Sequence, residues 1–372
     1  MKFSMVGDIM LSRLVGRKYL KNKYSVISDD VKNHLKKSDY VIGNLESPIY
    51  DSEKELDHLI FNASSSLLEE ISFFNFLSLA NNHINDCGDN GIRKTIESIK
   101  EFDSNGIFVE KYVPHIIRDK DFKLAIFTCT DMMNYQLNNK YKVCFIDDLF
   151  FLDLITEYRE KGYLILVYGH MGQLFSRFPN PKIRSICRKF VDAGADLVVT
   201  AHPHVLGGQE LYNGKNVFYS LGDFVMDGNS FRRRRSTILD FEIKNGNFMN
   251  FNLLFTNTNI ELQTVFSNIK TRNKSKKSWE KVSKYLNELK DLNKYLKIYK
   301  LLYKVEIFIH SISTLTFIVK SKGFKYLFKM LIARKDEVFR TIKWSLIDRS
   351  SLTKDDDAIK SDRKINKSSE LF

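Results

Sequence analysis

The sequence predicts an α/β fold in which polar residues collect at the carboxyl ends of buried strands. The clearest sign lies in residues 194–224, where the apolar run DLVVT has the character of a strand covered on both faces. His202 and His204 follow it on a tight turn that Pro203 stiffens. The chain has 372 residues, 43% of them hydrophobic, which is enough for one large α/β domain with an appendage.

Four earlier segments repeat this pattern of an apolar strand followed by polar residues. FSMVGDIM carries Asp8, DYVIGNLESP carries Asn44 and Glu46, and YLILVYGHMGQ carries His170. The fourth segment, FNFLSLANNHINDCGD, carries Asn81, Asn82, His83 and Asp86. If the strands are neighbours, their carboxyl ends meet at one edge of a sheet, where ligand sites form. We interpret Asp86 as a residue that orders the ANNH loop.

Carboxylate, amide and imidazole groups without thiolates suit Mn, Fe, Zn or Mg ions, and such a mixed set commonly holds two of them. Two loop histidines exposed to solvent are the alternative interpretation of the HPH pair alone. Two divalent ions can activate a water and neutralise charge on an attacked phosphoryl or carbonyl group. The sequence contains no G-x-S-x-G elbow, Walker-type phosphate loop or GxGxxG motif.

The order GDIM, NLESP, SLANNHINDCGDNG, GHMG, GADLVVTAHPHVLGG and FYSLGDF resembles the CapA family of capsule-synthesis proteins. That family was first associated with poly-γ-glutamate capsules and is similar to the calcineurin-like metallophosphoesterases. The resemblance covers residues 1–256, and the ANNH and HPH blocks are its most specific part. It implies a four-layer αββα sandwich with a two-metal centre at the carboxyl ends of the strands.

The resemblance also implies a role for each motif residue. Glu46 would bridge the two ions, and Asp8 and His204 would bind the first of them. The second ion would be held by Asn82, His170 and His202. His83 would donate a proton or stabilise an oxyanion. The residues expected on the substrate side of the site are Asn44, Asn81, Asp223, Arg232 and Arg233.

Several positions depart from the family pattern. Met10 stands where the wider phosphoesterase superfamily usually has a histidine, which removes one ligand of the first metal. Met171 and Gln173 replace an aromatic residue and a carboxylate, and Asp223 replaces an amide. A carboxylate can bind metal or pair with a cation, whereas an amide mainly orients its neighbours. These changes indicate an altered substrate.

Arg232 to Arg235 form a cluster of charge after SLGDFVMDGNS. Near the metal centre they would clamp phosphate or polycarboxylate through bidentate hydrogen bonds. The alternative is a solvated turn before the strand STILDFEI. Nucleic acid is a weaker candidate, because no aromatic and basic platform or helix-turn-helix pattern accompanies the arginines.

The region 257–349 is expected to be a basic helical extension. A lysine-rich linker, NIKTRNKSKKS, precedes segments of helical period in which Leu286, Leu289, Leu292, Leu296 and Tyr299 share one face. That face is expected to pack on the main domain. The alternative is an interfacial helix, supported by Lys320, Lys322, Lys325 and Lys329 among apolar residues. Residues 350–372 are expected to form a disordered tail.

The net charge of +13 is concentrated from Asn268 onward. A solvated basic surface and contact with an anionic membrane both explain it. We expect no secretory signal before Asp8, and we expect VEIFIHSISTLTFIV to be too short and too interrupted to span a bilayer. The four cysteines lack CxxC spacing and are expected to be reduced. A cytoplasmic protein, with peripheral membrane contact as an option, is the expectation.

Two classes of function are consistent with these features. The first is a metal-dependent hydrolase of the phosphoesterase type, acting on an anionic or phosphorylated intermediate of cell-surface polymer assembly. The second is a non-catalytic accessory protein that binds such a polymer or its synthesis machinery. The seven motif residues from Asp8 to His204 favour the first, while Met10 and the basic extension keep the second open.

Overall fold

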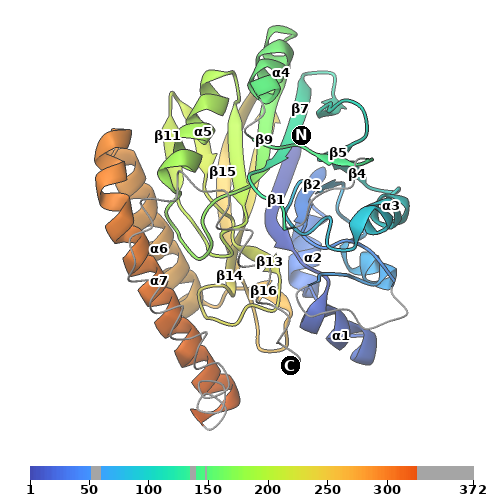
Figure 1. Cartoon of the computed structure of the whole chain (residues 1–372), viewed down its shortest axis with the longest axis vertical. Helices are drawn as coiled ribbons and strands as arrows, with labels where there is room; N and C mark the ends of the chain where they lie inside the picture. Colours follow the sequence, from blue (N-terminus) through green and yellow to red (C-terminus); the bar gives the residue numbers. More distant parts are fainter. Residues whose placement is uncertain (52–59, 135–139, 147–148, 325–372) are drawn as a thin grey trace. The chain divides into compact units, whose positions relative to one another are not determined.

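The computed structural model describes residues 1–51, 60–134, 140–146 and 149–324 (Figure 1). One compact unit runs from Met1 to Lys320, and a second begins at Ser321. The expected tail 350–372, and with it Lys325 and Lys329, lies outside the described residues.

The larger sheet of the described chain is built around β1 (Lys2–Ile9). β1 is parallel to β2 (Tyr40–Leu45) and β13 (Asp223–Val225), and antiparallel to β14. The other strands of this sheet are β3 (Phe76–Ser78), β4 (Asp103–Asn105), β14 (Arg235–Lys244), β15 (Asn247–Thr258) and β16 (Thr264–Phe266). The antiparallel pair β14 and β15 matches the strands expected from STILDFEI and FMNFNLLF.

The smaller sheet has the strand order β11-β12-β10-β9-β7-β6. Its inner strands β7 (Lys123–Thr130), β9 (Leu164–His170) and β10 (Leu197–Ala201) are parallel and almost wholly buried. Its edge strands are β6 (His115–Arg118) and β11 (Gln209–Tyr212), and β12 (Lys215–Phe218) lies between β11 and β10. A short separate pair joins β5 (Ile107–Phe108) to β8 (Lys142–Val143).

Three apolar clusters show that the two sheets and their helices form four layers. One cluster joins the sheets to each other through side chains such as Phe3 and Met5 of β1, and Leu166 and Tyr168 of β9. A second packs the larger sheet against α1 (Arg13–Asn22), α2 (Asp29–Leu35) and α3 (Gly88–Ser98). The third packs the smaller sheet against α4 (Leu149–Glu160), α5 (Pro181–Asp192), α6 (Ile269–Glu288) and α7 (Leu292–Lys322). The predicted αββα arrangement with a C-terminal helical extension is confirmed.

The expected lysine-rich linker is helical, because NIKTRNKSKKS forms the first turns of α6. The Asn268 side chain accepts a hydrogen bond from the Thr271 N–H and caps the helix. Ser275 and Val282 are buried on one face, so the lysines of α6 occupy the other. The segment had too few apolar residues for its helical period to be apparent.

The single apolar face expected from Leu286 to Tyr299 is divided between two helices. α6 ends at Glu288, and Asp291 starts α7 by accepting hydrogen bonds from the N–H groups of Asn293 and Lys294. Leu286 and Tyr299 are buried, whereas Leu296 is half exposed. The chain therefore packs both helices on α5 and the smaller sheet, as Figure 1 shows for α6 and α7.

The compact unit Met1–Lys320 includes residues on both sides of the boundary expected after residue 256. Within it, α6 and α7 contribute Val282, Leu286, Tyr295 and Tyr299 to the core. The sequence analysis also expected the apolar segment within α7 to be too short to span a membrane, and the helix is longer than that segment. Leu292–Lys320 is long and apolar enough to cross a membrane, by length and composition alone, although it contains Glu306. Only 11% of its most apolar window is buried.

Candidate metal centre

Strand register brings the predicted ligands to one edge of the molecule. Asp8 lies beside Asn44 of β2 and Asp223 of β13, and His170 of β9 lies beside Ala201, the residue before His202. β1 and β13 approach closely because Gly7 has no side chain; a Cβ there would lie 1.8 Å from the Gly222 carbonyl oxygen. His202 and His204 have φ angles of 96° and 56°, a conformation that costs energy for residues other than glycine.

Asp8, Glu46 and His204 form the first group of potential ligands. One ligand atom from each lies within 4.8 Å of the others, and all three residues are buried. His204 Nδ1 lies 3.6 Å from Asp8 Oδ2, and His204 Nε2 lies 3.8 Å from Glu46 Oε1. This is the set predicted for the first ion.

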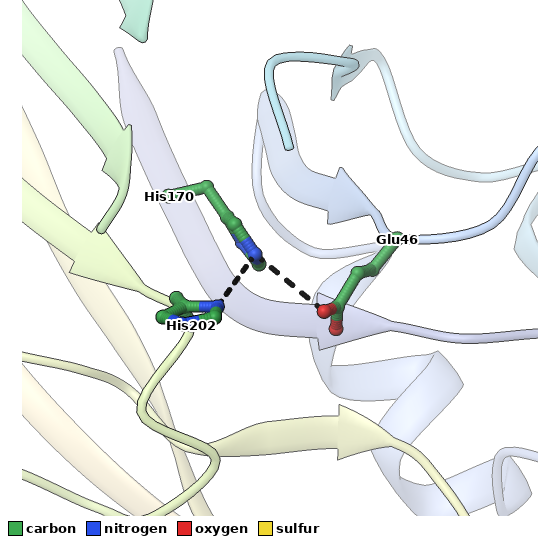
Figure 2. Close-up of side chains that lie close together, drawn as sticks. All are labelled: Glu46, His170 and His202. Carbon is green, nitrogen blue, oxygen red and sulfur yellow. Dashed lines mark hydrogen bonds and ion pairs between the residues drawn. The ribbon is translucent and has the colours of Figure 1, made fainter. Parts of the chain in front are cut away.

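Glu46, His170 and His202 form the second group, drawn in Figure 2. His170 lies between the other two: its Nε2 is 3.1 Å from His202 Nδ1 and 3.5 Å from Glu46 Oε1. Asn82 Oδ1 is 2.8 Å from the same nitrogen. The residues predicted for the second ion are thus together, and Glu46 belongs to both groups.

The donor atoms fit divalent cations. Both oxygens of Glu46 and Nε2 of His202 are buried without a hydrogen-bond partner in the protein, which is costly unless another group satisfies them. Burial and the neighbouring imidazoles lower the pKa of His202 well below its usual value, and burial and Arg233 do the same for His204. Both rings are therefore neutral at pH 7, the form that binds metal.

The two carboxylates differ in their environments. Burial, together with Asp8 and Asp223, raises the pKa of Glu46 well above its usual value. Burial also tends to raise the pKa of Asp8, but the charge and hydrogen bond of His170, the charge of His204 and a hydrogen bond from Asn44 bring it below its usual value. Glu46 is consequently the carboxyl group with most to gain from a bound cation.

His83 lies beside the second group and is held by its own loop. Its Nδ1 is 2.7 Å from Asp86 Oδ2 and 3.1 Å from the Asn134 side-chain nitrogen. Asp86 also accepts a hydrogen bond from the Phe61 N–H, consistent with the loop-ordering role predicted for it. Asn134 binds Asn82 as well, with 3.0 Å between their side-chain atoms, so one amide links His83 to a predicted ligand.

Asn44 and Asn81 orient the ligands. Asn44 donates a hydrogen bond to Asp8 Oδ1 at 2.8 Å, and its side-chain nitrogen is 3.0 Å from His170 Nδ1. Asn81 donates to the Leu45 carbonyl and lies 3.3 Å from the Asn44 oxygen. Both amides are fully buried, which places them behind the ligands.

The structure separates the two arginines expected on the substrate side. Asp223 Oδ1 lies 2.8 Å from His204 Nδ1, and Arg233 Nε lies 3.7 Å from Asp223 Oδ2. Arg232 instead donates hydrogen bonds to the side chain and the backbone carbonyl of Glu306 in α7. Arg233 therefore adjoins the ligand cluster, and Arg232 is occupied elsewhere.

Sequence reasoning missed several neighbours of the cluster. Asn134, Phe61 and Arg13 lie in segments with no motif of their own. Only the fold brings Asn134 and Phe61 to His83, and Arg13 to the Phe61 ring. Asp131, which follows β7, accepts a hydrogen bond from the Gly172 N–H, and burial raises its pKa to about 6. Its position after an apolar strand was the signal that could have identified it. Met10 is buried in the core between the larger sheet and its helices.

Comparison with known proteins decides the family. The model for the bacterial capsule synthesis protein PGA_cap matches residues 2–228. This chain belongs to that family. The predicted membership is confirmed, and the match contains every predicted ligand.

Two CapA proteins are among the relatives of this family member. The PGA biosynthesis protein CapA of Bacillus subtilis (strain 168) is 32% identical over 256 residues, covering 65% of this chain and 67% of the relative. The capsule biosynthesis protein CapA of Bacillus anthracis is 30% identical over 276 residues, covering 65% of this chain and 63% of the relative. The chain thus spans about two thirds of the length of each.

Solved structures give weaker likenesses. The calcineurin-like phosphoesterase YfkN from Bacillus subtilis matches with a TM-score of 0.45 and 12% identity, over 77% of this chain and 98% of that chain. A hypothetical protein from Thermus thermophilus matches with a TM-score of 0.43 and 13% identity, over 68% of this chain and 98% of that chain.

Proposed function

We propose that this PGA_cap family member is a metal-dependent hydrolase of the phosphoesterase type, acting on an anionic or phosphorylated intermediate of capsule or cell-surface polymer assembly. The observation that carries this proposal is the pair of buried ligand groups that share Glu46. Bound divalent ions would polarise the attacked group and lower the pKa of a bound water. No side-chain nucleophile is then needed.

The protein residues have separate tasks in this proposal. Asp8 and His204 would hold one ion, Asn82, His170 and His202 the other, and Glu46 both. His83 would donate a proton to a leaving group or stabilise a developing oxyanion, and its contacts with Asp86 and Asn134 support this role. The asparagines behind the ligands keep their donor atoms in position.

Metal analysis and hydrolysis of chromogenic phosphate esters test this proposal together. Purified protein incubated with Mn²⁺ should retain the metal after dialysis and hydrolyse a monoester or a diester. Glu46→Gln should lose both properties, whereas Glu97→Gln, an exposed acidic change in α3, should keep them. Retained metal without any hydrolysis across a panel of esters would contradict the hydrolase.

An accessory role is the second candidate, and Met10 is the observation that favours it. Met10 is buried among apolar side chains, so the first ion lacks a ligand that phosphoesterases usually place there. A protein of this kind would bind an anionic polymer without cleaving it. Tight binding of such a polymer by metal-loaded protein, without any product, would select this candidate.

We further propose that the protein works in the cytoplasm at a membrane surface, through the outward face of α7. Seven apolar side chains of that helix are at least 39% exposed: Leu296, Leu301, Val305, Phe308, Ile309, Ile312 and Leu315. Exposed lysines at 294, 297, 300 and 304 accompany them. Glu306 is buried against Arg177 and Arg232, so the opposite face stays on the protein.

Binding to lipid vesicles tests the membrane proposal. Attachment to anionic vesicles should weaken steeply with salt, because each lysine near the surface contributes about 1 kcal/mol and is screened. Phe308→Ser with Ile312→Ser should abolish attachment, while Leu211→Ser, an exposed apolar change in β11, should not. Equal attachment of all three proteins, or a dimer that hides α7, would contradict the proposal.

A further inference from the structure

Arg13, Phe61 and His83 form a stack at the edge of the metal centre. The Phe61 and His83 rings are parallel within 2°, with centroids 3.7 Å apart. The Arg13 guanidinium carbon lies 4.5 Å from the Phe61 centroid. Because the imidazole covers one face of the phenyl ring, the guanidinium takes the other. Arg13 has a φ of 52°, so its backbone adopts an uncommon conformation to reach this place.

A second stack of the same composition comes from other parts of the chain. The Phe175 ring is parallel to His310 within 3°, with centroids 4.1 Å apart, and Arg233 lies 5.5 Å from the Phe175 centroid. Phe175 also has a left-handed backbone, with a φ of 62°. His310 belongs to α7, so the C-terminal extension contributes to this stack.

Both guanidinium groups retain donor capacity. The Nε atoms of Arg13 and Arg233 are buried without a hydrogen-bond partner in the protein. Arg13 pairs with Asp227, and Arg233 donates to the sulfur of Met226 and adjoins Asp223. The two arginines thus flank the segment that follows β13. An oxyanion is the ligand that such planar, fixed donors recognise best.

The charges of both arginines affect the pKa of Glu46, one of the predicted metal ligands. Burial, Asp8 and Asp223 raise the pKa of Glu46, and Arg13 and Arg233 partly oppose that rise. Burial, Arg232 and Arg233 lower the pKa of His310 to about 4, with only Glu306 acting in the other direction. His310 is therefore neutral at pH 7 and supports the Phe175 ring without repelling Arg233.

We propose that Arg13 and Arg233 bind an anionic oxygen group of the substrate, a phosphate or a carboxylate, at the edge of the metal centre. This inference deepens the proposed function, and it rests on that function because it assumes that the bound anion belongs to the substrate. Stacking on Phe61 and Phe175 restricts each guanidinium before the anion arrives, which reduces the entropy lost on binding. α7 is a positioning element for Arg233, acting through His310.

Calorimetric titration of the full-length, manganese-loaded protein with inorganic phosphate, and separately with glutarate, tests this inference. Arg13→Gln and Arg233→Gln should each weaken binding of the preferred anion by about tenfold or more, since each removes charged hydrogen bonds. The corresponding lysine variants should bind more tightly than the glutamine variants, because they keep the charge. Arg93→Gln, an exposed change in α3, is the matched control and should bind as the parent does.

A separate substitution tests the positioning role of α7. His310→Ala should weaken anion binding by about two- to fivefold, the size of a lost stacking support, with unchanged manganese content. If His310 has a purely structural role, the substitution would lower the unfolding temperature without changing the anion affinity of the folded protein. Preference for phosphate or for glutarate identifies which anion the site takes, and either preference supports the inference.

The outcomes separate this inference from the hydrolase proposal. Parental affinity for both anions in the two glutamine variants, with full manganese content, overturns the arginine site. The same conclusion follows if the parent binds neither anion. Unchanged KM of Arg233→Gln in an active enzyme overturns the arginine site alone. If the glutamine variants lose anion binding and the parent hydrolyses no ester, the arginine site is supported and the hydrolase proposal is contradicted.

Discussion

Glu46 is the residue on which the candidate centre depends, because it alone belongs to both ligand groups. The bridging role proposed for it follows from the family resemblance, and its place after an apolar strand predicted that it would lie near the histidines. The neighbours of His83 could not be predicted in this way. Asn134 and Phe61 contact it through folding of distant loops, and neither occupies a recognisable motif.

His83→Ala tests whether His83 acts as a proton donor and not as a metal ligand. We expect kcat for a chromogenic ester to fall by about 10²- to 10⁴-fold, the usual contribution of a positioned proton donor. Manganese content should stay at the parental level, because His83 belongs to neither ligand group. His115→Ala, a change in β6 outside the cluster, serves as the control. An unchanged kcat would show that His83 is not the donor, and lost metal would show that it is a ligand.

At the scale of elements, two buried ion pairs that share Glu210 join α5 to β11, and hydrogen bonds join α5 to the end of α6. Arg184 and Arg188 both donate to Glu210, and Arg184 also donates to the backbone carbonyls of Leu286 and Leu289. The periodicity of α6 and α7 predicted helices but gave no sign of these polar contacts. Carbonyl groups at the end of α6 have no sequence signature, and so the tight attachment of the extension could not be predicted.

Glu210→Gln should lower the free energy of unfolding by about 3–5 kcal/mol, because it leaves two buried arginines without their anion. Burial tends to raise the pKa of Glu210, but hydrogen bonds and charge from Arg184, and hydrogen bonds from Arg188 and Tyr219, bring it below its usual 4.5. The ionised Glu210 carboxylate therefore stabilises the folded protein fully above pH 4.5. This stabilisation is lost as the pH falls through the lowered pKa of the folded state.

Urea denaturation of parent and variant from pH 7 to pH 3 checks this prediction. The difference in unfolding free energy should be constant above about pH 5 and should shrink as the pH falls below the usual glutamate pKa. Glu288→Gln, which alters an exposed residue of α6, should show little effect at any pH. A difference that grows toward low pH would contradict the assigned direction of the shift.

At the scale of the whole molecule, the family resemblance implied the four layers, whereas the start of the C-terminal helices had no clear signal in the sequence. Continuous apolar runs predicted strands such as β1, β9 and β10, because strands buried on both faces are apolar throughout. The lysine-rich start of α6 was interpreted as a linker, because its buried face contains Ser275 and few large side chains. The apolar face of the extension was expected to pack on the main domain, and the extension shares a core cluster with α5 and the smaller sheet.

Truncation after Ser267 should destabilise the protein. It removes four buried apolar side chains, each contributing about 1.5–3 kcal/mol. It also removes the carbonyl partners of Arg184 and Arg188. Thermal unfolding should shift down strongly, or the product should be insoluble. Truncation after Phe324 keeps these contacts and is the control. A soluble Ser267 product with parental unfolding temperature and metal content would show that the extension is independent.

The number of metal ions bound per chain tests the central claim most directly. Metal-free protein titrated with Mn²⁺, and analysed by elemental mass spectrometry after dialysis, should retain two ions per chain, as two groups sharing one carboxylate require. His202→Ala should retain one ion and Glu46→Gln none, with unchanged circular dichroism in both. A parent that binds no metal, or a Glu46→Gln variant with the parental metal content, would contradict the two-metal centre.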